Sequence, residues 1–268
     1  NLLQDWQLDQ DAVALANPLS AELAVMRTSL LPGLVKTLTN NSARQQTRLR
    51  LFEMGRVFSL QEAVAPLERQ MLGAVFHGPS LSEQWAVKAA QLDFYDVKAI
   101  LDAVLAVSGF SAAYRVSDKA FMHPGRSADV LVDGQAVGVI GALHPRMNKL
   151  LDLPGDVFAF ELDLSALPQR PLPKASTISR FPSVRRDLAL LVPESVAWGE
   201  IERCVSATLG ARLQSVTIFD QYHGTGLQPG TKSLAMGLIL HDISRTLNDV
   251  DVEQSISDVL EKLGTDCQ

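Results

Sequence analysis

The sequence has only two cysteines in 268 residues, Cys204 and Cys267, and they lie far apart. This excludes a disulfide-stapled scaffold and a metal site of paired cysteines, and it favours a reducing cytoplasm. No uncharged apolar run reaches the roughly 18 residues that a membrane-spanning helix needs. No period of about 20 to 50 residues repeats, which excludes solenoids and propellers. The composition, 47% apolar and 20% charged, is that of a folded globular chain.

Positive charge is also scarce. The chain has 24 Lys and Arg against 30 Asp and Glu, a formal net charge of −6. From Ser176 onward, eight basic and twelve acidic residues give −4. Because contacts with phosphate need Lys and Arg, this balance counts against broad, charge-driven binding of nucleic acid.

The chain starts with Asn1, and no signal peptide is recognisable at this end, so we expect it to be part of a longer protein. Its clearest internal break is ALPQRPLPKAS at residues 166–176, where three prolines disfavour both helix and sheet. We therefore predict a domain at residues 1–165, a linker at 166–176 and a second domain at 177–268.

The first domain is predicted to be α+β. Apolar residues recur at helical spacing over residues 94–108, and Gly109 follows as a stop. The run ADVLVDGQAVGVIGAL is apolar on both sides of Asp133-Gly134, which indicates a β-hairpin. Strand-like runs at residues 49–58 and 71–77 complete a mostly antiparallel sheet flanked by helices. The helix is expected to bury Phe94, Val97, Ile100, Leu101, Val104 and Leu105.

The second domain has the order strand, helix, strand, strand, helix, at residues 188–192, 198–209, 215–222, 233–240 and 249–263. This order predicts a ferredoxin-like sandwich with both helices on one face of an antiparallel sheet. In the third strand the alternate residues that face away from the helices are mostly small: Ser233, Ala235, Gly237 and Ile239. Such a face admits a flat base, as in several RNA-binding folds, or is covered by a loop or subunit.

None of the candidate catalytic motifs in the sequence supports a catalytic or metal site. GTGLQPGTKS, at residues 224–233, resembles a phosphate-binding loop, but a strand follows it instead of a helix, so a hairpin loop is the better interpretation. The five histidines show no metal-ligand spacing, and no G-x-S-x-G motif positions a serine nucleophile. Acid pairs such as Asp93/Asp96 lie at helix starts, where capping explains them. We predict no catalytic residue and no metal site.

Several distinctive strings occur in a fixed order along the chain. Those in the first half are NPLSAELAVMRTSLLPGLV (17–35), LFEMGRVF (51–58), FYDVKAILDAVL (94–105) and HPGRSADVLVDGQAVGVIGALHP (123–145). Those in the second half are FPSVRRDLALLV (181–192), IFDQYHGTG (218–226), KSLA (232–235) and RTLND (245–249). Together they closely resemble the phenylalanyl-tRNA synthetase β-subunit family of bacteria. The first half is similar to that family's catalytic-like module, and the second half to its ferredoxin-fold anticodon-binding domain.

The resemblance implies a class II synthetase-like antiparallel sheet followed by a ferredoxin-like βαββα(β) sandwich. It also implies a cytoplasmic enzyme, a heterotetramer of two α and two β subunits, that joins phenylalanine to tRNA(Phe) with ATP and magnesium. Catalysis would belong to the α subunit, with no cofactor in this segment. Residues Arg27, Thr28, Ser29 and Pro32 would contact the α subunit. For Arg27, an ordinary surface ion pair is the alternative.

For the second domain, the resemblance implies anticodon contacts at Ala189, Tyr222 and Ser233. A tyrosine ring offers a stacking surface, and a small residue and a hydroxyl permit close approach and a hydrogen bond to a base edge. A strand-end core tyrosine is the alternative for Tyr222. Phosphate or interface contacts are expected at Arg180, Arg185 and Arg186. After the last predicted helix, only GTDCQ remains for a closing edge strand, which would be truncated or very short.

The sequence therefore predicts a non-catalytic part of a phenylalanine–tRNA ligase β chain, with tRNA and the α subunit as partners and no membrane. Two alternatives remain: a free-standing RNA-binding or scaffold paralogue, and an enzyme that holds a small phosphorylated ligand in the glycine-rich loop. The acidic balance limits the nucleic-acid contact to a small one, so this chain alone is expected to bind tRNA weakly at physiological salt.

Overall fold

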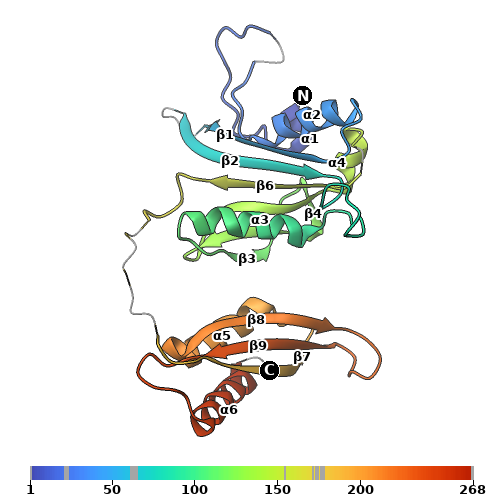
Figure 1. The fold of residues 1–268 in the computed structure, drawn as a ribbon. Helices are drawn as coiled ribbons and strands as arrows, with labels where there is room; N and C mark the ends of the chain where they lie inside the picture. The colour runs from blue at the N-terminus through green and yellow to red at the C-terminus, as the bar shows by residue number, and fades with distance from the viewer. Residues whose placement is uncertain are drawn as a thin grey trace. The chain divides into compact units, whose positions relative to one another are not determined.

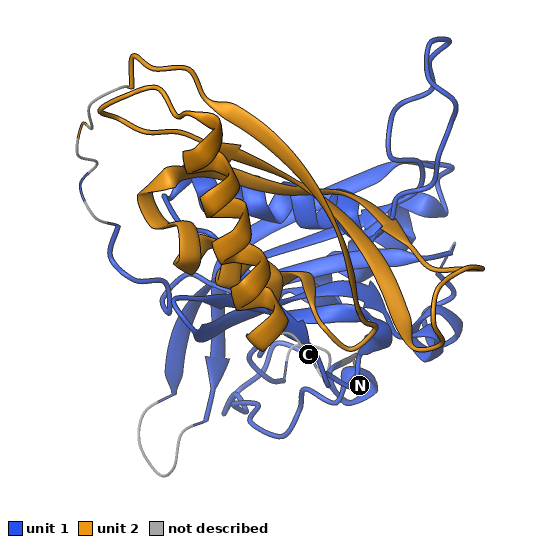
Figure 2. Ribbon diagram, turned by 90° about the horizontal axis from the view of Figure 1, so that it is seen from below, with its two compact units in different colours: residues 1–172 blue, residues 173–268 orange. Residues whose placement is uncertain are grey.

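The computed structural model describes residues 2–20, 24–60, 66–153, 155–170, 172, 175 and 179–266. The chain forms two compact units, Asn1–Leu172 (unit 1) and Pro173–Gln268 (unit 2) (Figure 2). Unit 1 contains two hydrophobic cores and unit 2 contains one. The division falls within the stretch predicted to be a linker. Of that stretch, Pro171, Pro173, Lys174 and Ser176 lie outside the described residues.

Unit 1 contains a six-stranded sheet in which neighbouring strands are antiparallel, in the order β1-β2-β6-β5-β4-β3 (Figure 1). The predicted antiparallel sheet is thereby confirmed. Its strands are β1 (Leu49–Ser59), β2 (Leu67–His77), β3 (Ala113–Val116), β4 (Met122–Val132), β5 (Gln135–Leu143) and β6 (Val157–Asp163).

Helices cover both faces of this sheet. On one face, α1 (Leu2–Trp6), α2 (Leu31–Ser42) and α4 (Pro145–Leu150) pack in a core that includes Val75 of β2. On the other face, α3 (Phe94–Val107) packs in a second core, which includes Phe76, the next residue of β2. Because successive side chains of a strand point to opposite faces, β2, β4, β5 and β6 each contribute to both cores.

Two local predictions for unit 1 are confirmed. Asp133 and Gly134 join β4 to β5 with φ of 50° and 80°, the left-handed conformations that a two-residue hairpin turn requires. Helix α3 starts with a reciprocal capping box, in which Asp93 accepts from the Asp96 backbone N–H and Asp96 accepts from that of Asp93. The predicted apolar stripe of α3 is only partly buried: Val97, Leu101 and Leu105 are in the core, but Ile100 is 38% exposed.

Other elements of unit 1 were not anticipated. Strand β6 buries six of its seven residues, so it lacks the alternation that identifies a half-exposed strand. Strand β3 has four mostly exposed residues, which is too short for a periodic pattern. Helix α2 was also missed, and it follows the segment that contains Arg27 and Ser29.

Unit 2 has the predicted order of elements. They are β7 (Val184–Pro193), α5 (Trp198–Leu209), the short 3₁₀ helix η2 (Gly210–Arg212), β8 (Leu213–Tyr222), β9 (Thr231–Leu240) and α6 (Asp249–Asp266). The sheet is antiparallel in the order β7-β9-β8, and both helices contribute to its single core. This is the ferredoxin-like arrangement without a closing strand among the described residues, because α6 continues to Asp266, beyond its predicted end at 263.

Candidate nucleic-acid interface

The two faces of β9 differ as its sequence predicts. One set of alternate residues is almost fully buried against the helices: Leu234, Met236, Leu238 and Leu240. The other set, Ser233, Ala235, Gly237 and Ile239, faces away from the helices. We call this side of the unit 2 sheet the open face.

The strand register brings the three predicted anticodon residues onto the open face. Ser233 of β9 is the partner of Tyr222 on β8. Ala189 of β7 is the partner of Ala235, two residues along β9 from Ser233. Since directly opposed residues share a face and diagonal neighbours lie within about 7–8 Å, the three form one small group.

The loop after β8 holds Tyr222 in position. Its hydroxyl donates to the Thr225 carbonyl oxygen at 3.1 Å, and the side chain is exposed, with 46% of the residue's surface accessible. A Cβ on Gly224 would lie 2.7 Å from that hydroxyl oxygen, so a larger residue there would displace the ring. Tyr222 is therefore not a core residue, and its ring is available for stacking.

The arginines near this strand lie in different places. The guanidinium of Arg185 lies on the open face, where its Nε donates to Asp187 Oδ1 at 2.8 Å. Arg186 lies on the helix side of the sheet, with Nη2 3.7 Å from Asp249 Oδ1 at the start of α6. Arg180 is exposed in the segment before β7. Of the three, only Arg185 shares the face of Tyr222.

The side chain of Arg185 also covers part of the open face. Its guanidinium carbon lies 5.7 Å from the centre of the Phe219 ring, and its Nη2 would lie 3.0 Å from a Cβ on Gly237. Phe219 is 54% exposed and lies at an irregularity in the β8–β9 register, between Ile218 and Asp220. No sequence pattern marks Phe219 as a site residue, because only the register shift and the Arg185 contact locate its ring on this face.

The glycine-rich segment is a hairpin loop, as predicted. It joins β8 to β9, and Gly226 and Gly230 have φ of 100° and 80°. Lys232 lies in β9, and its Nζ donates to the Glu194 carbonyl oxygen at 3.0 Å. The lysine therefore binds the backbone after β7, and a strand follows the loop where a phosphate site needs a helix N-terminus.

In unit 1, Arg27 is half-exposed. Its Nη1 pairs with Glu53 Oε1 at 2.5 Å, and its Nε donates to the Arg56 carbonyl oxygen at 2.8 Å. The guanidinium lies over Gly55, where a Cβ would approach Nη2 to 2.4 Å. Thr28 is partly buried and donates from Oγ1 to the Leu8 carbonyl oxygen at 2.7 Å. Arg27 thus makes the surface ion pair that was the alternative interpretation, while part of its side chain stays accessible.

Ser29 and Pro32 lie inside unit 1. Ser29 is 5% exposed, and its hydroxyl lies 3.0 Å from both carboxylate oxygens of Glu161 on β6. Glu161 also accepts from the Leu30 N–H at 2.6 Å, and Pro32 is buried in the first turn of α2. Desolvation raises the pKa of Glu161, although these hydrogen bonds oppose the rise. Ser29 and Pro32 were predicted to contact the α subunit, but their burial assigns both side chains to the core that anchors α2.

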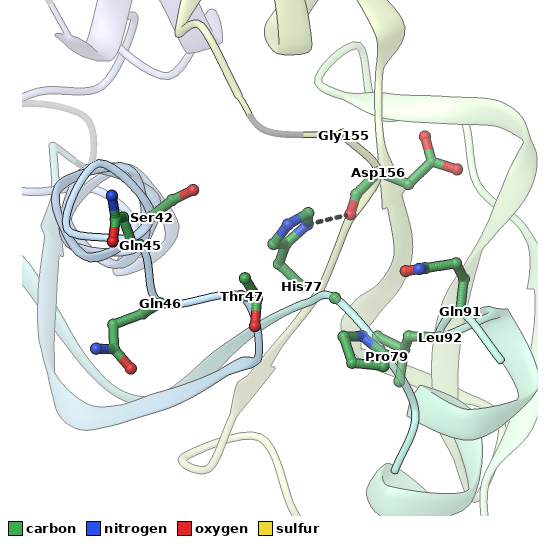
Figure 3. A pocket seen from close by; sticks show the side chains of 11 residues that line it. Ser42, Gln45, Gln46, Thr47, His77, Pro79, Gln91, Leu92, Gly155 and Asp156 are labelled. Carbon is green, nitrogen blue, oxygen red and sulfur yellow. Dashed lines mark hydrogen bonds between the residues drawn. The ribbon is translucent and has the colours of Figure 1, made fainter. Parts of the chain in front are cut away.

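Unit 1 also contains a cavity of about 580 Å³ with mixed polar and apolar lining near the C-terminal end of β2 (Figure 3). His77 Nδ1 lies 3.0 Å from the Asp156 carbonyl oxygen and must carry the proton, because a carbonyl only accepts. The Arg126 guanidinium lies 2.6 Å from the Asp156 carboxylate and lowers its pKa. The lining also contains Gln45, Gln91 and Thr47, whose side chains offer hydrogen bonds, and the apolar side chains of Pro79 and Leu92.

The described residues contain neither a metal-ligand cluster nor a membrane-spanning helix. No group of three or more His, Cys, Asp and Glu side chains there is arranged to hold a metal ion. None of the helices in the same ranges is long and apolar enough to cross a membrane.

Comparison with known proteins assigns both units. Residues 1–164 match the family model of the phenylalanyl tRNA synthetase beta chain CLM domain, and residues 179–268 match that of the ferredoxin-fold anticodon binding domain. A phenylalanine–tRNA ligase beta subunit of Xanthomonas oryzae pv. oryzae is 53% identical over 261 residues, which are 97% of this chain and 33% of the relative. One of Xylella fastidiosa is 48% identical, with the same shares. The chain thus spans about a third of the length of these curated relatives.

Proposed function

Because the chain belongs to the phenylalanyl-tRNA synthetase β-chain family, we propose that it recognises the tRNA(Phe) anticodon on the open face of unit 2, within a phenylalanine–tRNA ligase. The observation that carries the proposal is the common position of Tyr222, Ser233 and Ala189 on that face. The exposed ring would stack on a base. The small neighbours leave room for the base to approach the strand, and the Ser233 hydroxyl would hydrogen-bond its edge.

The charge of unit 2 supports a small contact rather than a broad one. With a net charge of −4 from Ser176 onward, this part of the chain repels a phosphate backbone overall. We therefore propose that other parts of the ligase supply most of the affinity for tRNA. The role of unit 2 would be to discriminate among anticodons.

For unit 1 we propose contact with the α subunit, in a cytoplasmic heterotetramer of two α and two β subunits. Arg27 is the proposed direct contact, since part of its side chain is accessible beside Glu53. Thr28 would contribute indirectly, because its hydrogen bond to the Leu8 carbonyl oxygen positions the backbone next to Arg27. Aminoacylation with ATP and Mg²⁺ would take place in the α subunit.

The alternative of a phosphate-loop enzyme is disfavoured by the hydrogen bond between Lys232 and the Glu194 carbonyl oxygen. The alternative of a free-standing RNA-binding protein makes a different prediction about assembly. If our proposal is right, the native full-length chain co-purifies with an α subunit.

The anticodon proposal is tested by Tyr222→Ala in the complete ligase. We expect binding of tRNA(Phe) to weaken by about 5- to 150-fold, because one stacked base contributes about 1–3 kcal/mol. Binding of a tRNA(Phe) with an altered anticodon should weaken less.

Tyr222→Phe is the matched control. It keeps the ring and removes only the hydroxyl that binds the Thr225 carbonyl oxygen, so it should retain most of the affinity. An equal loss for both tRNAs with Tyr222→Ala would contradict a base-specific role.

A further inference from the structure

The open face has a second aromatic position besides Tyr222. Phe219 lies three residues earlier on β8, at the register irregularity, and 54% of its surface is accessible. A β-bulge redirects one side chain relative to regular alternation, and it is a common device for aiming a residue at a site. An apolar ring this exposed contributes little to the core and is a candidate for a binding contact.

Arg185 is the only one of the three predicted arginines on this face, and it makes two weak contacts there. It pairs with Asp187, with 62% and 52% of the two side chains exposed, and its guanidinium lies over Phe219 at 5.7 Å from the ring centre. Exposed ion pairs contribute little to stability, so Arg185 can exchange Asp187 for another anion at small cost. An aromatic ring with a nearby arginine matches one nucleotide, since the ring stacks on the base and the arginine pairs with the phosphate.

The part of β9 beside the two rings is low, because its open-face positions are Ala235 and Gly237. A Cβ on Gly237 would meet Arg185 and Asp187. On β8, the exposed side chain of Asp220, the partner of Ala235, lies on the same face between the rings, so a phosphate-binding arginine has to act against this acid. Phe219 and Tyr222 are separated by roughly 10 Å, at about 3.3 Å per strand residue. This separation exceeds the stacking distance of adjacent bases, so bases on the two rings would be splayed apart, as in sequence-specific recognition of single-stranded loops.

We propose that Phe219 and Arg185 form a second nucleotide position on the open face, for the anticodon-loop nucleotide next to the one on Tyr222. The base stacks on the Phe219 ring, and Arg185 releases Asp187 and pairs with the phosphate of that nucleotide. Asp187 then holds Arg185 in place only while the face is empty. This inference rests on the proposed anticodon recognition, because it extends the same surface.

The test measures the affinity of the complete ligase for a tRNA(Phe) transcript over a range of salt concentrations. Phe219→Ala should weaken binding by about tenfold, the loss of one base stack, without changing the salt dependence. Phe219→Trp, which keeps a stacking surface, should bind close to the original affinity. Transcripts that lack one base at each anticodon-loop position in turn identify the partner, since Phe219→Ala should have no further effect when that base is absent.

The arginine is tested separately. Arg185→Ala should weaken binding and lower the slope of log affinity against log salt by about 0.7, the value for one phosphate contact in a single strand. Asp187→Asn distinguishes this role from a structural one. If Arg185 serves the phosphate, Asp187→Asn strengthens tRNA binding a few-fold, whereas a structural pair would make it weaken binding as Arg185→Ala does.

The outcomes separate this inference from the proposed function. If Tyr222→Ala weakens binding and Phe219→Ala does not, the second position is wrong and anticodon recognition stands. If neither variant weakens binding, both are wrong. An unchanged salt slope in Arg185→Ala would overturn the phosphate contact.

Discussion

The central strands of the two sheets have different surroundings. In unit 1, β6 buries six of its seven residues between two cores, with α2 on one side and α3 on the other. In unit 2, β9 buries one set of alternate residues against α5 and α6 and turns small residues to the open face. Both sheets are antiparallel, so strand direction does not explain the difference. The number of helical layers decides whether a sheet has a face available to a ligand.

The difference extends to the residues that the sequence marks as functional. In unit 1, the second layer of helices draws Ser29 and Pro32 into the core and leaves Arg27 at the edge. In unit 2, Tyr222 and Ala189 stay accessible. A residue predicted from sequence to contact a partner is therefore more often accessible on a sheet with helices on one face than on a sheet with helices on both faces.

The largest expected effect compares two phenylalanines. Phe160 on β6 is 2% exposed and packs against Phe76, whereas Phe219 on β8 is 54% exposed. Phe160→Ala should lower the free energy of unfolding by about 3–5 kcal/mol, because it leaves a cavity in the core. Phe219→Ala should change it by less than about 0.5 kcal/mol. Urea titrations of the two variants measure this, and equal destabilisation would remove the contrast between the units.

The next prediction adds volume instead of removing it. Ala159 on β6 is fully buried, and Ala235 on β9 lies on the open face. Ala159→Leu should destabilise the chain by about 1–3 kcal/mol through overpacking. Ala235→Leu should leave the thermal midpoint nearly unchanged but weaken tRNA binding by about tenfold, because it raises the low part of β9 beside the two rings. Unimpaired binding by Ala235→Leu would show that no base approaches this strand.

The third prediction concerns Glu161, the buried carboxylate that anchors α2. Its folded-state pKa is raised by burial, so its contribution to stability is greatest below its unfolded pKa of about 4.3 and is lost as the pH rises through the folded value. The difference in unfolding free energy between the original chain and Glu161→Gln should therefore fall with pH in that window, by at most about 1.4 kcal/mol per pH unit. Urea titrations across the window measure it. A difference that is constant with pH would show that the pKa of Glu161 is the same in the folded and unfolded states, which would contradict the prediction.

The smallest expected effect is at the edge of unit 1. The Arg27–Glu53 pair has 44% and 38% of its side chains exposed, so Glu53→Gln should change the free energy of unfolding by less than about 1 kcal/mol. Arg27→Ala should be similarly mild for stability, but it should weaken assembly with the α subunit if Arg27 makes the proposed contact. Sedimentation of the mixed subunits measures assembly. Normal assembly by Arg27→Ala would leave Arg27 with only its surface ion pair.

Several elements were predictable because their signals are local. The Asp133-Gly134 turn needs left-handed backbone at two adjacent residues, and few residue types tolerate that. Helix α5 was predicted with its observed bounds, and the alternation of apolar and small residues along β9 was enough to predict the open face. By contrast, β6 was missed because a strand covered on both sides has no alternation, and β3 because it is short and exposed.

The candidate site divides in the same way. Tyr222, Ser233 and Ala189 came from motifs, and the strand register brings them onto one face. Phe219 and the position of Arg185 over it could not be predicted, because they depend on a register irregularity and on a contact across three strands. The inward orientation of Ser29 depends on Glu161, which is 132 positions away in the chain.

The sequence by itself determined the family, the antiparallel sheets, the ferredoxin-like order of unit 2 and the side of β9 that stays open, because backbone preferences and alternation act over a few residues. Only the tertiary structure decided the number of layers on each sheet, the burial of Ser29 and Pro32, and the pairing of Arg185 with Phe219. These features depend on which distant segments become neighbours. The free energy of burial and of a hydrogen bond is set by those neighbours and not by the residues adjacent in the chain.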